Sequence, residues 1–322
     1  MDKSLELSIV APMYNERDNI VGTLEEIKKA MHGAKFEWEL IFVDDGSTDG
    51  SFKKAKKLEI QESYLKVIGY RTNMGRGRAL REGFKHARGN YIITVDFDLS
   101  YSADQILNIY NKFKEDESVD AVLGSCYMEG GDVKGIGLVR HLISRLGNRV
   151  LGIVFPGNFH TTTCIFRGYK REIIQNIELE SNRKDIHLEI LSKLLALNSK
   201  IIEIPAKLTC RKKGKSKFKL RESVANHLAF TFFEKPILLF GLLGIICLVI
   251  GLILGLHIIY LRLAGLLNPD RPLIPITVIL VLAGVQILSF GFIAMQIIML
   301  RREVLINQKN IKMLQKRSLK NE

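Results

Sequence analysis

At 322 residues the chain has room for one large domain and a second, smaller segment. Its net charge of +13 is concentrated at one end, because residues 1–210 carry 30 basic and 29 acidic side chains whereas residues 211–322 carry 17 basic and 5 acidic. Basic residues beside long apolar runs indicate an anionic membrane surface and argue against nucleic acid as the partner. The four cysteines have no paired spacing, which argues against a zinc site or a disulfide framework.

Short apolar runs predict four β-strands near the start of the chain, at residues 7–11, 40–43, 65–70 and 91–95. The first strand begins so close to the N-terminus that we expect no signal peptide. It leads into a predicted helix with Asn15 as its cap and an apolar face that includes Ile20 and Leu24. Strands that alternate with helices predict an α/β fold with a doubly wound, mostly parallel sheet and right-handed crossovers.

Polar loops follow all four predicted strands, at residues 12–16, 44–45, 71–77 and 96–100. In a parallel sheet such loops meet at one edge, where open α/β sheets bind their ligands. Their acids suit a ribose or a base, and Gly75 and Gly77 allow backbone amides to approach phosphate, although flexibility at a helix start also explains these glycines. We therefore expect a nucleotide site that is neither the dinucleotide fingerprint nor a P-loop, since both motifs are missing from the sequence.

Asp96 and Asp98 stand one residue apart directly after the fourth strand. Two anionic oxygen donors suit Mg2+ or Mn2+, which often complete their coordination with substrate phosphates. A strand end followed by a solvated turn is the structural alternative. The presence of several strand-end carboxylates in one region favours the metal site.

Two long apolar runs without charged residues occupy the C-terminal part, at residues 237–261 and 273–300. Each exceeds the roughly 20 residues that cross a bilayer core, so both predict transmembrane helices. Residues 211–221 and the tail after residue 300 hold seven basic side chains each, whereas the connecting loop holds two. The positive-inside rule therefore predicts an integral membrane protein with its first domain and both termini in the cytoplasm. The predicted parts are a cytosolic domain at 1–220, an interfacial amphipathic helix at 221–235, a transmembrane hairpin at 236–302 and a basic cytosolic tail at 303–322.

Four motifs carry a resemblance to a known family, and they lie at residues 9–16, 42–49, 73–89 and 96–100. Together they resemble the inverting glycosyltransferases of family two, which have the GT-A fold. More narrowly, the chain is similar to the dolichol-phosphate mannosyltransferase and polyprenyl-phosphate glycosyltransferase branch. The similarity runs from about residue 7 to residue 220.

The resemblance implies roles for individual residues on the donor side. The residues expected along the nucleotide base and ribose are Pro12, Tyr14, Glu16, Val43 and Asp45. Asp96 and Asp98 are expected to hold the cation that bridges the donor diphosphate, with Phe97 and Ser100 beside them. Arg211 and Lys217 match cations that face the phosphates in the family.

The resemblance also implies an acceptor side. Three residues are expected near the lipid phosphate, namely Arg140, Ser144 and Arg145. Glu189 matches an acid beneath the family's active site, and with Asp98 it is a candidate for an acid–base or orienting role. Arg211 is expected to stabilise charge on the departing diphosphate.

Two departures from the family pattern fall on the sugar and acceptor side. Cys126 stands where the family often has an arginine, and residues 161–167 lack the acid and the glycine of the family motif. They leave the nucleotide half intact and the identity of the sugar open.

The implied reaction is transfer of a hexose from a nucleotide-diphospho-sugar to polyprenyl or dolichyl phosphate, with inversion. GDP-mannose is the favoured donor, and UDP-glucose or UDP-N-acetylglucosamine is the alternative. A polysaccharide synthase is a weaker interpretation because the only tryptophan, Trp38, does not belong to a Gln-x-x-Arg-Trp element. A non-catalytic membrane scaffold is disfavoured by the intact Asp96, Asp98, Arg211 and Lys217.

Overall fold

The computed structural model describes residues 5–134, 159–209, 236–266 and 272–318. The chain forms two compact units, one made of Met1–Val224 with Gln308–Glu322 and the other of Ala225–Asn307. The first unit contains the α/β sheet, and the second contains the apolar helices.

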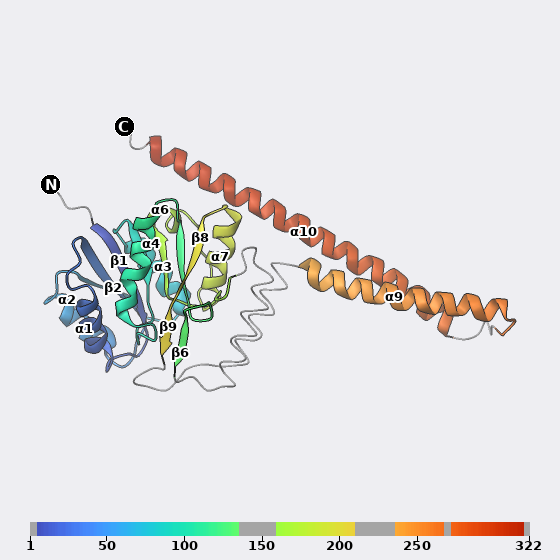
Figure 1. Cartoon of the computed structure of the whole chain (residues 1–322), viewed down its shortest axis with the longest axis horizontal. Helices are drawn as coiled ribbons and strands as arrows, with labels where there is room; N and C mark the ends of the chain where they lie inside the picture. The colour runs from blue at the N-terminus through green and yellow to red at the C-terminus, as the bar shows by residue number, and fades with distance from the viewer. Residues whose placement is uncertain (1–4, 135–158, 210–235, 267–271, 319–322) are drawn as a thin grey trace. The chain divides into compact units, whose positions relative to one another are not determined.

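Within the described residues, seven strands of the first unit form one sheet (Figure 1). In chain order they are β1 (Leu5–Met13), β2 (Glu37–Asp45), β3 (Leu65–Tyr70), β4 (Tyr91–Thr94), β5 (Ala121–Ser125), β7 (Arg167–Lys170) and β8 (Ile201–Pro205). Their order across the sheet is β3-β2-β1-β4-β7-β5-β8, and β7 runs antiparallel to both of its neighbours. A second, two-stranded sheet pairs β6 (Asp132–Lys134) with β9 (Lys207–Thr209). The predicted parallel arrangement of the first four strands is confirmed, so their carboxyl ends share one edge.

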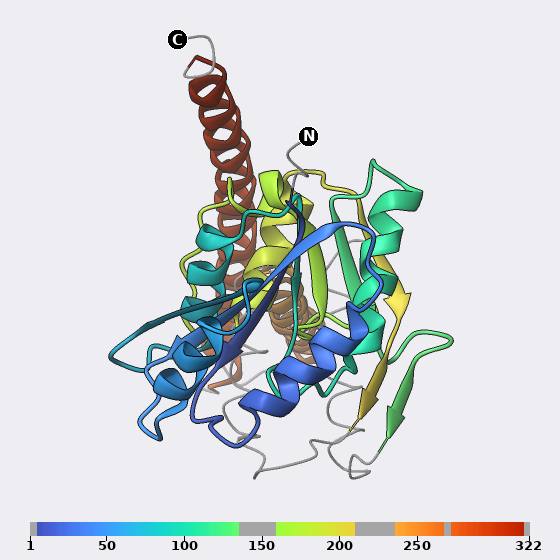
Figure 2. The same cartoon turned by 90° about the vertical axis from the view of Figure 1, so that its left-hand side faces the viewer.

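Helices cover both faces of the large sheet, as Figure 2 shows. In chain order they are α1 (Ile20–Ala30), α2 (Ser51–Glu59), α3 (Arg76–His86), the 3-10 turn η1 (Ala103–Gln105), α4 (Ile106–Glu115), α6 (Arg171–Ile174) and α7 (Ile186–Ala196). Apolar side chains of α1, α2 and α4 pack on one face with Ile9 and Phe42, and those of α3, α6 and α7 pack on the other face with Val10 and Val43. This division follows from the alternation of strand side chains, since neighbours such as Ile9 and Val10 point to opposite faces.

The prediction that Asn15 caps the first helix is wrong. The helix begins at Ile20, with Asn19 as its N-cap residue. Asn15 instead has a left-handed backbone with φ of 53°, and its Oδ1 accepts a hydrogen bond from the Thr48 amide at 2.8 Å. Its side chain therefore holds two loops of the sheet edge together. The predicted apolar face is confirmed, because Ile20 and Leu24 are buried.

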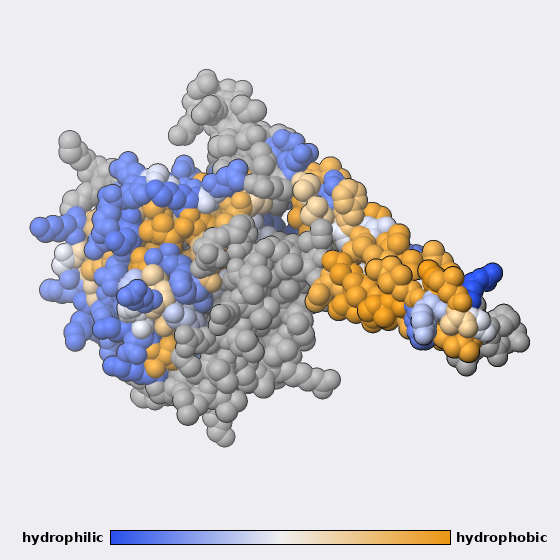
Figure 3. All heavy atoms as spheres, turned by 45° about the vertical axis from the view of Figure 1, so that its right-hand side comes forward, coloured by the Kyte–Doolittle hydropathy of each residue, from blue (hydrophilic) through white to orange (hydrophobic). Residues whose placement is uncertain are grey.

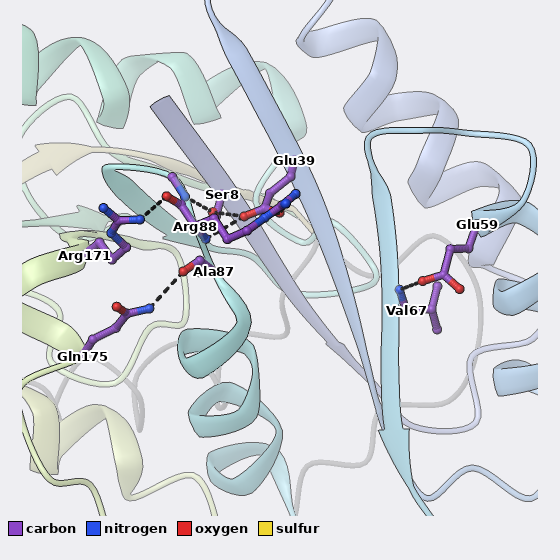
Figure 4. Close-up of polar contacts among 9 residues, drawn as sticks. Ser8, Glu39, Glu59, Val67, Ala87, Arg88, Arg171 and Gln175 are labelled. Carbon is purple, nitrogen blue, oxygen red and sulfur yellow. Dashed lines mark hydrogen bonds and ion pairs between the residues drawn. The ribbon is translucent and has the colours of Figure 1, made fainter. Parts of the chain in front are cut away.

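A buried carboxylate closes the opposite, amino-terminal edge of the sheet (Figure 4). Glu39, at the start of β2, is 3% exposed and accepts hydrogen bonds from Ser8 Oγ at 2.6 Å and from the Arg88 amide at 2.7 Å. The Arg88 guanidinium also contacts it, with Nη2 at 3.0 Å. These bonds tie β1, β2 and the turn before β4 together at the edge of the sheet that lies away from the polar loops.

The second unit contains α9 (Pro236–Leu263) and most of α10 (Leu273–Ser318), as far as Asn307. Among the described residues, these two helices contain stretches long and apolar enough to cross a membrane, Phe240–Leu263 and Leu273–Arg301. Most of their apolar side chains are exposed, and they form the large continuous orange surface at the right of Figure 3. Such an apolar surface in water is unfavourable, and it supports association with a membrane.

Small and hydroxylated residues adapt these helices to each other and to an apolar environment. A Cβ atom added at Gly284 would lie 2.7 Å from Leu248 Cγ, so glycine allows close packing of α9 and α10. The Thr277 and Ser289 hydroxyls donate to carbonyl oxygens four residues earlier, at 2.8 and 2.9 Å. Both hydroxyls are thus satisfied within their own helix.

Candidate active site

The loops after β1 and β2 are joined by hydrogen bonds at the carboxyl edge of the sheet. The Asn15 amide donates to Ser47 Oγ at 2.8 Å, and the Glu16 amide donates to Ser51 Oγ at 2.9 Å. The Arg17 amide donates to Asp49 Oδ2 at 3.2 Å. The two loops therefore form one ordered wall of the site.

Asp45, at the end of β2, anchors the loop that follows β3. Its carboxylate is buried and accepts hydrogen bonds from the Tyr70 hydroxyl at 2.7 Å and from Asn73 Nδ2 at 2.9 Å. It also accepts from the amides of Met74 and Gly75, both at 2.9 Å. Burial and the adjacent Asp45 charge raise the pKa of Tyr70, which keeps that hydroxyl a donor. The carboxylate thus shapes the loop that was expected to approach phosphate.

The start of α3 packs against residues 180–183. A Cβ atom added at Gly75 would lie 2.5 Å from the Asn182 carbonyl oxygen, and one at Gly77 would lie 2.4 Å from the Ser181 carbonyl oxygen. The Arg78 amide donates to the same Asn182 oxygen at 3.2 Å. Only glycine allows so close an approach, so Gly75 and Gly77 serve packing as well as loop geometry.

Glu189, on α7, holds residues 180–183 in place from the other side. Its carboxylate accepts hydrogen bonds from the amides of Glu180 and Ser181, both at 2.9 Å, and pairs with Lys193 Nζ at 2.6 Å. Burial alone would raise the pKa of Glu189, but Lys193 and these amides outweigh burial and hold the pKa below its usual value. The side chain is charged and well satisfied, which suits an orienting role.

Asp96 and Asp98 lie in a tight turn directly after β4. The Leu99 amide donates to the Asp96 carbonyl at 3.0 Å, and Leu99 has a φ of 50°. Asp98 Oδ1 accepts from the Ser100 hydroxyl at 2.7 Å and from the Ser100 amide at 3.1 Å. Asp96 Oδ1 lies 3.1 Å from Nη2 of Arg76, the first residue of α3.

Asp96 and Asp98 are the residues in this turn that would hold a divalent cation. Across the described ranges, no group of three or more His, Cys, Asp or Glu side chains is placed to hold a metal ion. These two carboxylates alone would not fill the coordination of Mg2+, which phosphate oxygens and water often complete.

The other predicted site residues fall into two groups. Val43 and Phe97 have side chains buried in the core, so these side chains contribute packing, whereas Pro12, Tyr14 and Glu16 lie at the edge where β1 ends. Glu16 Oε2 accepts from Asn19 Nδ2 at 2.6 Å. The remaining predictions lie outside the described residues, namely Arg140, Ser144, Arg145, Arg211 and Lys217.

Tyr101 lies beside both sugar-side departures, because its hydroxyl approaches Cys126 and its ring stacks on Phe166 within residues 161–167. Cys126 and Cys164 are both buried, and the Tyr101 hydroxyl lies 3.6 Å from Cys126 Sγ. Cys126 is thus a core residue. Burial raises the pKa of the Cys126 thiol to about 11, so it is uncharged.

A carboxylate that the motifs did not indicate reaches this region from β8. Glu203 accepts hydrogen bonds from the amides of His160 and Thr161, both at 2.9 Å, and from His160 Nδ1 at 2.9 Å. Thr161 and Ser125 share a hydrogen bond of 2.7 Å between their hydroxyls. An acid is therefore present beside residues 161–167, although it comes from another strand. Sequence reasoning missed Glu203 because it stands in no motif, and it did not single out Arg76, which lies within the motif at 73–89.

Solved structures share this fold. Glucosyl-3-phosphoglycerate synthase from Mycobacterium tuberculosis, in complex with Mn2+, UDP and glucosyl-3-phosphoglycerate, aligns with a TM-score of 0.51 and 18% identity over 71% of this chain and 79% of its own. Mannosyl-3-phosphoglycerate synthase from Rubrobacter xylanophilus aligns with a TM-score of 0.51 and 17% identity over 82% of this chain and 77% of its own. The class of fold is therefore GT-A-like, as the motifs implied.

The family follows from the sequence. The pattern of Glycosyl transferase family 2 matches residues 8–178, which is more than half of the chain. The chain therefore belongs to glycosyltransferase family 2, and it is a glycosyltransferase. Dodecaprenyl-phosphate galacturonate synthase of Rhizobium johnstonii is 29% identical over 91% of this chain and 87% of the relative. Dolichol-phosphate mannosyltransferase of Pyrococcus furiosus is 30% identical over 67% of this chain and 60% of the relative.

Proposed function

We propose that this enzyme transfers a sugar from a nucleotide-diphospho-sugar to a polyprenyl phosphate at a membrane surface, with inversion at the anomeric carbon. The observation that carries the proposal is the order of its parts, a family 2 domain followed by two helices long and apolar enough to cross a membrane. A relative named for dodecaprenyl phosphate aligns with 91% of the chain, which supports the same conclusion. A relative named for dolichol phosphate supports the same class of acceptor.

GDP-mannose is the first donor to test, with UDP-glucose and UDP-N-acetylglucosamine as the alternatives. The name of the Pyrococcus furiosus relative supports mannose. Other relatives are named for galacturonate and for 4-deoxy-4-formamido-L-arabinose, so the donor varies among them. Cys126, and the missing acid and glycine at residues 161–167, make the sugar side of this chain unlike the family pattern, and a wider panel of donors is therefore justified.

The acceptor phosphate is anionic at neutral pH, so its attack on the anomeric carbon needs positioning more than a strong general base. Arg140, Ser144 and Arg145 are proposed to position that phosphate, and Arg211 and Lys217 are proposed to face the departing diphosphate. When bound at Asp96 and Asp98, Mg2+ or Mn2+ supplies positive charge that stabilises the leaving group.

The proposed role of Glu189 is to orient its neighbours. Its carboxylate oxygens already accept hydrogen bonds from two amides and pair with Lys193. Those contacts favour the orienting role over the acid–base role among the two that the resemblance implies. Through residues 180–183, Glu189 supports the start of α3 and with it the donor side of the site.

The enzyme is proposed to face the cytoplasm, where nucleotide sugars are made. Excess Lys and Arg on both flanks of the hairpin support that orientation, since the loop between the two helices holds two cations. The basic segment at 211–221 is proposed to dock the domain on anionic head groups, at about 1 kcal/mol per cation near the surface.

The decisive experiment measures transfer of radiolabelled sugar to an organic-extractable lipid. Purified full-length protein is incubated with short dolichyl phosphate, Mg2+ or Mn2+, and a panel of GDP- and UDP-sugars. One donor is expected to label the lipid, and Asp98→Ala is expected to lower the rate by at least about 100-fold because an incomplete cation site leaves the leaving group unstabilised.

Glu117→Ala is the matched control, because it also removes one carboxylate but from an exposed position near the amino-terminal edge of β5. Its rate is expected to equal that of the wild-type protein. Metal-dependent binding of a nucleotide sugar with no labelled lipid for any donor would contradict the polyprenyl phosphate acceptor.

A further inference from the structure

Arg76 connects the loops of the nucleotide side with the predicted cation ligands. It is the first residue of α3, a helix that packs against β1 and β2. Its Nη2 lies 3.1 Å from Oδ1 of Asp96, which follows β4. Since β1 lies between β2 and β4 in the sheet, this side chain reaches past the end of β1 to the metal side of the site.

The backbone around Arg76 is anchored on both sides. Asp45 accepts a hydrogen bond from the Gly75 amide at 2.9 Å, and the Arg78 amide donates to the Asn182 carbonyl at 3.2 Å. A Cβ atom at Gly75 would lie 2.5 Å from that same Asn182 oxygen, so the start of α3 packs closely against residues 180–183. Arg76 thus combines an anchored backbone with a long side chain that is 36% exposed.

A guanidinium on Asp96 competes with a divalent cation for the same carboxylate. A cation held by Asp96 and Asp98 would bring two further positive charges within a few ångströms of Arg76, and like charges at that distance repel. A donor diphosphate brings anionic oxygens to the same place, and a planar guanidinium binds phosphate oxygens in a bidentate manner. The conflict is thus relieved when cation and diphosphate bind together.

We propose that Arg76 is a positioning residue that couples cation binding to donor binding. Its guanidinium neutralises Asp96 while no nucleotide is bound, and it transfers to the donor diphosphate when the cation takes the carboxylate. This inference rests on the proposed function, and it adds that the cation binds weakly alone and much more tightly with the nucleotide. The enzyme would then bind its donor and its metal as one unit.

The test is a binding experiment that needs no turnover. Binding of Mn2+ to detergent-solubilised full-length protein is measured by electron paramagnetic resonance of free Mn2+, with and without GDP or UDP. Arg76→Gln is expected to bind Mn2+ alone roughly three- to tenfold more tightly, as expected for removal of a partly exposed competing charge. The factor by which the nucleotide raises Mn2+ affinity is expected to fall at least about tenfold, because a charge-assisted phosphate contact is lost.

Two further variants separate charge from geometry and from general effects. Arg76→Lys keeps the competing charge without the planar fork, so its affinity for Mn2+ alone should equal that of the wild type while the coupling factor falls. Lys85→Gln removes a cation from the exposed last turn of the same helix and should change neither quantity. Thermal unfolding of each variant confirms that the fold is kept.

Unchanged Mn2+ affinity and unchanged coupling in Arg76→Gln would overturn the inference while the proposed function stands. If the wild-type protein bound no Mn2+ in the presence of either nucleotide, the proposed function and this inference would both fail. Tighter Mn2+ binding together with weaker coupling supports the inference.

Discussion

The Glu189 carboxylate and the Lys193 ammonium form a buried ion pair, with side chains 10% and 4% exposed. Glu189→Gln leaves the ammonium without its counter-ion, so we expect a loss of about 3 kcal/mol in the free energy of unfolding. Chemical unfolding in detergent measures it, with exposed Glu117→Gln as a control that should change stability by less than about 0.5 kcal/mol. A stable Glu189→Gln protein whose kcat is about 100-fold lower would instead indicate acid–base catalysis.

His187 lies on α7, as do Glu189 and Lys193, and its buried ring leads us to expect a specific dependence of stability on pH. Its ring is buried, and neither ring nitrogen has a hydrogen-bond partner among the residues that the structure describes. Burial, and then the positive charges of Arg167 and Arg76, hold its pKa well below 6.5. The native ring stays neutral, so below pH 6.5 only the unfolded chain gains the proton and the folded state loses up to about 1.4 kcal/mol per pH unit.

The variant His187→Leu should therefore be neutral or stabilising at pH 8, because it removes buried polar atoms without partners. At pH 5.5 it should gain about 1.4 kcal/mol relative to the wild type. Urea unfolding at both pH values measures the difference, and exposed His32→Leu is the control that should show no such gain. Parallel pH curves for wild type and His187→Leu would refute the assignment.

Single residues are where sequence reasoning reaches least far. The motifs indicated that Asp45 and Glu189 belong to the site, but a motif does not say which groups donate hydrogen bonds to their carboxylates. In the structure both carboxylates accept hydrogen bonds from backbone amides, at residues 74–75 for Asp45 and at 180–181 for Glu189. These amides come close only when the chain is folded. Asp96 and Asp98 were easier to predict, since a strand end places them at the sheet edge without help from distant residues.

At the scale of elements, the close packing of α3 against residues 180–183 can be tested by comparing two glycines, one inside this contact and one outside it. A Cβ atom at Gly77 would lie 2.4 Å from the Ser181 carbonyl oxygen, whereas one at Gly22 in α1 would meet nothing within 4 Å. We expect Gly77→Ala to lower stability by about 1–3 kcal/mol through overpacking, and Gly22→Ala to raise it by about 0.5–1 kcal/mol through helix propensity. Thermal unfolding of both variants measures these changes in stability. Equal effects would show that residues 180–183 can move to make room for the added methyl group at Gly77.

The first four strands and their loops were predictable because each strand is followed by a turn and a helix in a repeating pattern. The other half of the sheet was not. β7 has four residues, Arg167–Lys170, and runs antiparallel between β4 and β5. So short a run carries no periodicity, and its direction is set by pairing with strands far away in the sequence. The prediction that Asn15 caps the first helix failed for a similar reason, since the Asn15 side chain instead accepts a hydrogen bond from the amide of Thr48, far away in the sequence.

For the whole molecule, the proposed orientation predicts which surfaces face the cytoplasm. Leu266→Cys, after α9, should react with a membrane-impermeant maleimide in intact cells, because the loop between the helices is proposed to lie outside. Glu117→Cys should react only after the cells are permeabilised. The wild-type protein gives the background from its own cysteines. Labelling of Glu117→Cys in intact cells would reverse the proposed orientation.

The position of the sheet in the chain has a consequence for synthesis. The last strand of the large sheet, β8, ends at Pro205, and α9 begins 31 residues later at Pro236. At about 5–20 residues per second, the ribosome takes roughly 2 to 6 s between these points. All seven strands are therefore made before the first apolar helix leaves the ribosome. The first unit therefore has time to begin folding before α9 and α10 are complete.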